Sequence, residues 1–236
     1  MTSRLDARWS DWASYFDDVE QDMATLFHTR WMWKTITGIL DNSGIKQYVV
    51  VQNYLVRTYA ATMCTGIRRE SDIDTKTTSL ARCLQILIDS PKVFTRRRFD
   101  QLLRQGGNTD WYNDFGSGGF DVFASKDGEL LDPGKVQASL DRLHAAVEPV
   151  RRYTNEVVAH RQRADGAIEP VVVTYDEIDH ALDELGVITK QYYSLRHPDA
   201  QLAFLTPIVD LGFLNMFQVP WFPAGSTLAD NRRDHL

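Results

Sequence analysis

The chain has 236 residues, of which 43% are hydrophobic and 25% are charged. This balance is typical of globular proteins and excludes a disordered or collagen-like chain. The chain carries 26 lysines and arginines against 32 aspartates and glutamates, which gives a formal net charge of −6. Any contact with nucleic acid must therefore depend on a local basic patch.

Three features of the sequence favour a cytoplasmic protein. Cys64 and Cys83 stand singly, which predicts neither a disulfide framework nor a zinc site. The first twelve residues carry charges where a secretory signal would need an apolar run. The longest apolar stretch, 202–223, contains Asp210 and three prolines, so we expect no membrane span.

Helical periodicity dominates the first hundred residues. A stripe of apolar residues steps by threes and fours and predicts a first amphipathic helix: Trp9, Trp12, Phe16, Val19, Met23 and Leu26. Residues 46–67 are apolar on most sides and lack a turn signal, which favours a buried central helix over a strand. Two further helices are predicted, one through Leu80 and Leu84 that Pro91 ends, and a short basic one over 96–103.

The second half begins with a glycine-rich stretch, 105–132, which we interpret as a long loop. Asp132 and Pro133 then open the clearest helix, whose apolar residues step in fours and threes as far as Val157. Pro149 lies inside this pattern, so the helix is predicted either to kink there or to split with its register kept. The pair 165–166 (Asp-Gly) ends the helix.

A capping box formed by Thr174 and Glu177 opens the next helix, and His197 with Pro198 closes it. A last apolar helix is expected over about 200–217. The sequence therefore predicts an all-α fold, a single-domain irregular bundle of six to eight helices over 1–223, followed by a polar tail over 224–236.

Most motifs with chemical potential have simpler interpretations. The glycine cluster at 116–119 follows no strand and precedes no Gly-Lys-Ser/Thr, so it is no phosphate loop. Glu177 and His180 lie one helical turn apart, but a di-iron bundle needs a second such pair and two more carboxylates. We interpret His180 as a solvated helix residue and expect no metal and no cofactor.

The segment 151–163, RRYTNEVVAHRQR, is the strongest candidate site. On an α-helix Arg152, Glu156 and His160 share one face, because they are spaced by four residues. Neighbouring arginines lower the pKa of a histidine, which favours the neutral imidazole that a general base needs. The alternative is an ordinary helix end whose basic residues suit the helix dipole.

Residues 153–160, YTNEVVAH, resemble the polar-x-x-x-Ala-His end of the motif helix in the HEPN superfamily, and most closely its abortive-infection (AbiU-type) branch. The segment 67–72 (IRRESD) with Ser79 and Leu80 is similar to the same branch. The resemblance implies a dimeric helical bundle and a metal-independent ribonuclease of a toxin or phage-defence system. Carried over, His160 is the catalytic histidine and Asn155 is the polar residue of the motif.

The expected arginine of the HEPN motif does not align, because Thr154 stands at its position and Arg152 precedes the histidine by eight residues. We therefore hold two hypotheses. The first is a homodimeric ribonuclease in which His160, Asn155 and Arg152 act in catalysis and three arginines bind RNA phosphate: Arg151, Arg161 and Arg163. The second is a non-catalytic HEPN-like module that binds a partner protein, a nucleotide or RNA.

The resemblance also bears on partners. RNA is the expected substrate, and a cognate antitoxin or another defence component is a possible protein partner. The segment 202–222 is rich in large apolar residues, some of which are expected to cover a second copy of the chain.

Overall fold

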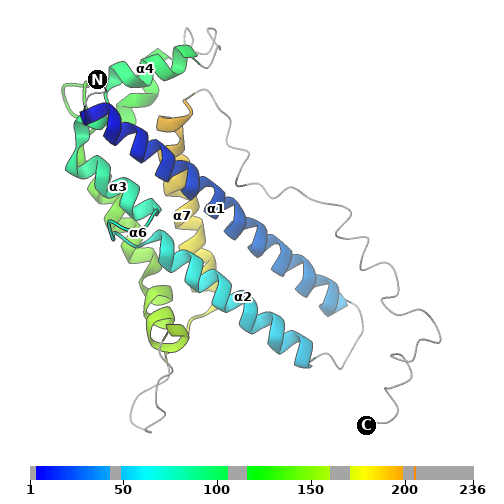
Figure 1. Ribbon diagram of the computed structural model, residues 1–236. Helices are drawn as coiled ribbons and strands as arrows, with labels where there is room; N and C mark the ends of the chain where they lie inside the picture. The colour runs from blue at the N-terminus through cyan, green and yellow to red at the C-terminus, as the bar shows by residue number, and fades with distance from the viewer. Residues whose placement is uncertain (1–3, 43–48, 106–115, 160–170, 199–204, 206–236) are drawn as a thin grey trace, which may run out of the picture. The chain divides into compact units, whose positions relative to one another are not determined.

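The computed structural model describes residues 4–42, 49–105, 116–159, 171–198 and 205 (Figure 1). The chain divides into two compact units, Met1–Thr206 and Pro207–Leu236, and every described residue belongs to the first. The described residues form helices and two isolated β-bridges but no strand. This confirms the predicted all-α fold.

Six α-helices are present in the described part of the chain: α1 (Arg4–Asn42), α2 (Val49–Glu70), α3 (Leu80–Asp89), α4 (Arg96–Gln105), α6 (Pro133–Tyr153) and α7 (Tyr175–Arg196). Three shorter elements accompany them: the 3₁₀-helices η1 (Pro91–Val93) and η2 (Gly116–Val122) and the π-helix η3 (Thr154–Ala159). α2 and α3 both pack against α1 and α6, and α7 packs against α1, α2 and α6.

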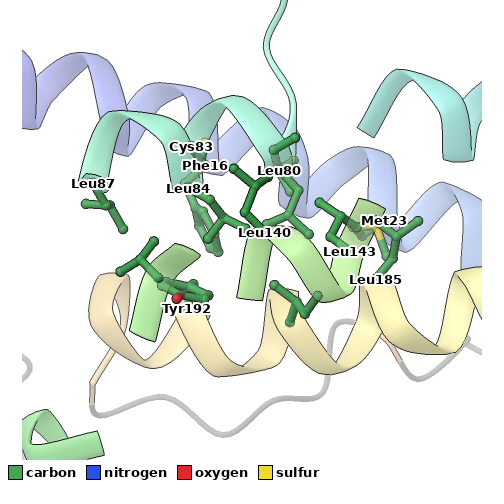
Figure 2. Close-up of a cluster of buried hydrophobic side chains, with 14 of the residues drawn as sticks. Phe16, Met23, Leu80, Cys83, Leu84, Leu87, Leu140, Leu143, Leu185 and Tyr192 are labelled. Carbon is green, nitrogen blue, oxygen red and sulfur yellow. The ribbon is translucent and has the colours of Figure 1, made fainter. Parts of the chain in front are cut away.

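The core of the unit lies where α1, α3, α6 and α7 meet (Figure 2). Phe16 and Met23 from α1 are fully buried, as are Leu84 from α3 and Leu143 from α6. Tyr192 of α7 is buried with them, and its hydroxyl lies 3.1 Å from Ser139 Oγ on α6. The stripe predicted on the first helix is thus the face that α1 buries, apart from its first member, Trp9, which is half-buried.

α6 and α7 begin where the sequence predicts. Asp132 caps α6 by accepting a hydrogen bond from the Gly134 amide, and Pro133 occupies the first turn, where no amide hydrogen is needed. The predicted capping box of α7 is present. The Glu177 amide donates to Thr174 Oγ1, and the Thr174 amide donates to Glu177 Oε2 at 2.7 Å.

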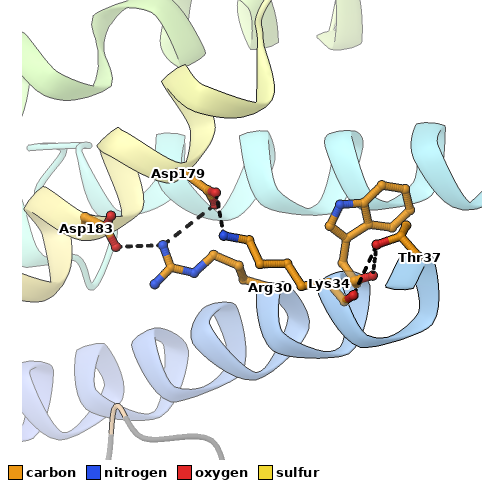
Figure 3. Close-up of polar contacts among 6 residues, drawn as sticks. Arg30, Lys34, Thr37, Asp179 and Asp183 are labelled. Carbon is orange, nitrogen blue, oxygen red and sulfur yellow. Dashed lines mark hydrogen bonds and ion pairs between the residues drawn. The ribbon is translucent and has the colours of Figure 1, made fainter. Parts of the chain in front are cut away.

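Contacts between α1 and α7 combine ion pairs with one close approach. Arg30 and Lys34 of α1 pair with Asp183 and Asp179 of α7 at 2.6 and 2.7 Å (Figure 3). Further along α7, Gly186 faces the Phe27 ring so closely that a Cβ at this glycine would lie 2.6 Å from Phe27 Cζ. The absence of a side chain at Gly186 therefore permits this packing.

The predicted burial of residues 46–67 is correct only for the second half of the helix. α2 buries Tyr59, Met63 and Ile67, but its first two turns are open to solvent, and Val50 is 82% exposed. The choice of helix over strand is confirmed. The prediction of a buried central helix is wrong at this end, because an apolar composition does not say which segment another element covers.

The interpretation of 105–132 as one long loop also needs correction. Residues 106–115 lie outside the described residues, but Gly116–Val122 forms η2, and Phe120 and Phe123 are buried in the core. Phe120 stacks against Phe94 at 6.1 Å between ring centroids. Two aromatic side chains thus anchor a segment whose glycine content suggested an irregular loop.

Several predictions fall on residues outside the described part. These are the helix end at 165–166, the last apolar helix over about 200–217 and the polar tail over 224–236. Among the helices that the structure does describe, none combines the length and the apolar character needed to span a membrane.

Candidate functional site

The residues predicted to form the site divide into two groups. Arg151 and Arg152 lie in the last turn of α6, and Asn155 lies in η3; all three side chains are exposed. His160, Arg161 and Arg163 follow η3 and are outside the described residues. The described part of the motif therefore ends before the histidine.

The helix changes type within the motif. α6 continues through Pro149 and ends at Tyr153, after which Thr154–Ala159 forms a π-helix. A π-helix bonds residue i to i+5, so its positions do not keep the α-helical register. Val157, the last member of the predicted apolar stripe, is exposed. Short π segments are rare and frequently occur at functional sites.

Thr154, at the position of the expected arginine, has a structural role. It is 4% exposed, and its hydroxyl lies 2.7 Å from the Val150 carbonyl oxygen and 3.3 Å from that of Cys64 on α2. The first contact is a back-bond within the helix and the second joins η3 to α2. This position points into the bundle, and an arginine here would carry its charge into the core.

An arginine from another helix reaches the motif instead. Arg68, in the last turn of α2, is exposed, and its Nε donates to Asn155 Oδ1 at 2.7 Å. The two residues are 87 positions apart in sequence. The sequence points to Arg68 only as part of the segment 67–72 and does not predict it as a site residue. No sequence spacing could have found this contact, because it depends on how α2 packs against η3.

The two predicted arginines of α6 are held by glutamates. Arg151 contacts Glu148 through Nε at 2.9 Å and through a terminal nitrogen at 2.7 Å. Arg152 Nε lies 3.6 Å from Glu156 Oε1, four residues on, which confirms the first step of the predicted face. The second step, to His160, is outside the described residues. Arg68 differs from both, because its side chain contacts a neutral amide.

A buried carboxyl group lies beside Arg68 and Arg69. Glu70 is fully buried, its Oε2 accepts a hydrogen bond from the Leu80 amide, and Arg69 Nε lies 3.6 Å from its other oxygen. Burial raises the pKa of Glu70 to about 8; the Leu80 hydrogen bond opposes this shift, and the nearby Asp22 adds to it. Glu70 therefore joins the end of α2 to the start of α3.

One group in the described part of the chain has the composition of a metal site. Asp17, Glu20 and His197 present ligand atoms within 4.8 Å of one another. Asp17 already pairs with Arg196 at 3.2 Å, and His197 Nε2 lies 3.2 Å from Glu20 Oε1. Because a cation on α7 already occupies Asp17, the group forms an ion-pair network and we infer no metal there.

The remaining candidates are accounted for by structure. His180 is exposed, and Glu177 is engaged in the capping box rather than directed toward it. Both cysteines are buried thiols, and burial raises their pKa, to about 12 for Cys64. A reactive cysteine needs a lowered pKa, so neither residue suits nucleophilic chemistry.

Comparison of the chain with protein-family models, with curated proteins and with solved structures finds no match.

Proposed function

We propose that this protein is a metal-independent endoribonuclease that acts as a homodimer in a toxin or phage-defence system. The observation that carries the proposal is the contact between Arg68 and Asn155. It supplies an exposed guanidinium beside the polar residue of the motif, five residues before His160, although Thr154 replaces the expected arginine. The proposal thus adds Arg68 to the arginines expected to hold phosphate.

The chemistry needs a phosphate-binding cation, a base and an acid. Arg68 contacts a phosphate oxygen through its terminal nitrogens while its Nε stays on Asn155, because guanidinium has five donors in a fixed plane. His160 removes the proton of the RNA 2′-hydroxyl, and the 2′-oxygen attacks phosphorus. The 5′-oxygen leaves with a proton from a second histidine, which yields a 2′,3′-cyclic phosphate.

A homodimer supplies that second histidine, since one imidazole cannot act as base and acid in the same step. Support comes from the surface beside Asn155, where Val157 and Val158 of η3 are exposed. A second copy that covered these two side chains would remove apolar surface from water. A two-fold arrangement would also double the arginines around the substrate.

The test is a cleavage assay with purified protein, single-stranded RNA and excess EDTA. We expect cleavage that leaves 2′,3′-cyclic phosphate ends, and His160→Ala should lower the rate by about 10²–10⁴-fold, the usual contribution of a general acid or base. His180→Ala, at an exposed histidine of α7, is the matched control and should keep the full rate. Intact RNA with wild-type protein, or full activity of His160→Ala, would exclude the proposal.

The second candidate, a non-catalytic module, is favoured by one observation. Thr154 is buried and hydrogen-bonded, so the motif position itself holds no cation. In that case the protein would bind RNA or a nucleotide through Arg68 and leave it intact. A filter-binding assay run beside the cleavage assay separates the two functions. The non-catalytic module should bind RNA and leave it uncut both with and without EDTA, whereas the ribonuclease should cut RNA under both conditions.

A further inference from the structure

A pocket of about 190 Å³ lies between the N-terminal half of α1 and α3. α1 contributes residues spaced by three and four positions, and α3 with its C-cap contributes a second such row: Arg8, Asp11 and Tyr15, and Arg82, Ile86, Asp89 and Ser90. Each row is one face of a helix, so the pocket is built by regular elements. Its volume is below the roughly 300–1,000 Å³ of drug-sized sites, so it suits a small ligand.

Contacts beside the pocket hold α1 and α3 together. Trp12, on the neighbouring face of α1, is fully buried and its Nε1 donates to the Cys83 carbonyl oxygen of α3 at 3.2 Å. Its ring stacks on Phe16, with centroids 5.1 Å apart. At the rim, Arg8 donates a hydrogen bond to Ser90 Oγ. These contacts fix the spacing between the two helices, so the cavity does not depend on a loop.

The charges in the pocket are not matched to one another. Arg82 Nε is buried without a hydrogen-bond partner, and its guanidinium forms no ion pair with any residue that the structure describes. Asp11 and Asp89 line the same pocket, yet within the described part of the chain no ion pair joins them to Arg8 or Arg82. Asp89 instead accepts a hydrogen bond from Gln85. A buried, unsatisfied donor on a charged group costs more than a neutral one and calls for an explanation.

We propose that this pocket binds a small zwitterion of the amino-acid class. Its carboxylate lies between the guanidinium groups of Arg8 and Arg82, which are suited to planar oxyanions. Its ammonium group lies against Asp11 and Asp89. Tyr15 and Ile86 supply the apolar walls. A bare anion would meet two carboxylates and a bare cation two arginines, so a ligand with both charges matches the site best.

The site is separate from the proposed ribonuclease motif. Asp22, which pairs with Arg69 beside that motif, lies eleven residues beyond Asp11 on α1, and this corresponds to about 16 Å along the helix. The inference therefore stands independently of the proposed function.

Isothermal titration calorimetry tests the proposal, with each of the twenty free amino acids as probe. Inorganic phosphate and putrescine, which carry charge of one sign only, are the controls. At least one amino acid should bind, whereas neither control should. Arg82→Gln should weaken that binding about 10–100-fold, as expected for loss of a charge-assisted hydrogen bond. Asp11→Asn should weaken it as well, and Arg97→Gln, on the exposed face of α4, should leave it unchanged.

Protein stability separates a ligand site from a structural arginine. Because Arg82 Nε has no partner, Arg82→Gln should melt at or above the wild-type temperature. If that variant does not fold, the amino-acid affinity of Asp11→Asn, which alters an exposed position, tests the proposal instead. The proposal is overturned if no amino acid binds, if phosphate binds in place of amino acids, or if binding occurs but neither pocket variant affects it.

Discussion

At the residue scale, the end of α2 brings together groups with different tasks. Arg68 turns outward to Asn155, whereas Glu70, two residues on, is fully buried and accepts a hydrogen bond from the first amide of α3. That amide is one of the helix-terminal donors that lack a partner within the helix. The carboxyl oxygen therefore links the end of α2, which carries Arg68, to the start of α3.

The raised pKa of Glu70 predicts how stability depends on pH. The folded state holds this proton up to about pH 8, whereas an unfolded glutamate releases it near its ordinary value of 4.5. Between these values the folded state binds more protons, so the free energy of unfolding falls as pH rises. Glu20, with its pKa raised to about 7 by burial and by Asp17, adds a slope of the same sign.

Glu70→Gln should remove the contribution of Glu70. The amide oxygen can still accept from the Leu80 amide and carries no charge to bury. As the pH rises from 5 to 9, the free energy of unfolding of Glu70→Gln should increase by a few kcal/mol relative to that of wild type, since one pKa unit corresponds to about 1.4 kcal/mol. Urea denaturation at both pH values measures this gain. An unchanged difference between the two proteins across that range would contradict the account.

The sequence could predict only those parts of the site that depend on local spacing. That Arg152 and Glu156 share one face could be predicted, because it is local and depends only on helical spacing. The contact of Arg68 with Asn155 could not be predicted, because it depends on the packing of α2 against η3 across 87 positions. At position 154 the sequence indicates only that the expected arginine is missing. The burial of Thr154 explains why no arginine stands there.

At the element scale, helix starts were easier to predict than helix burial. Caps at Asp132 and Thr174 are chemical signals within four residues, and both are confirmed. The exposed start of α2 and the ordered η2 were mispredicted for a common reason. Composition reports that a segment is apolar or rich in glycine, but only the neighbouring elements determine what is buried.

Two glycines test the packing of α1 against α7. Gly186→Ala would place a Cβ 2.6 Å from Phe27 Cζ, whereas a Cβ at Gly38 of α1 would meet nothing within 4 Å. Gly38→Ala should stabilise the protein by up to about 1 kcal/mol through helix propensity. Gly186→Ala should be less stable than Gly38→Ala by about 1–3 kcal/mol, the usual cost of overpacking.

Chemical denaturation of the two alanine variants gives the comparison directly. Since both substitutions replace a helical glycine, the difference between them isolates the contact with Phe27. Equal free energies of unfolding would show that α1 and α7 do not approach each other as closely as described.

At the scale of the whole molecule, the proposed mechanism requires two copies of the chain. The sequence predicts a dimer from the apolar segment 202–222, of which only Leu205 is described. Leu205 is 5% exposed and lies near Gly186, so this residue serves the core of its own chain. The exposed valines of η3 are now the better candidates for the contact.

Light scattering at micromolar concentration should return twice the single-chain mass of 27.0 kDa. Val158→Glu should shift the mass toward that of one chain, because it places a charge on the proposed contact. Val172→Glu, at another exposed valine outside η3, is the control and should leave the mass unchanged. A wild-type mass of one chain would exclude the obligate dimer.

The central claim is that Arg68 supplies the phosphate-binding cation of a ribonuclease motif. The most direct measurement is the rate of single-stranded RNA cleavage in EDTA by Arg68→Gln, compared with Arg57→Gln, which alters an exposed arginine eleven residues earlier on α2. The account predicts a rate lowered about 10–100-fold for Arg68→Gln, corresponding to about 1.5–3 kcal/mol for a charged hydrogen bond. Arg57→Gln should retain the wild-type rate. Equal rates for the two variants, with both proteins folded, would contradict the claim.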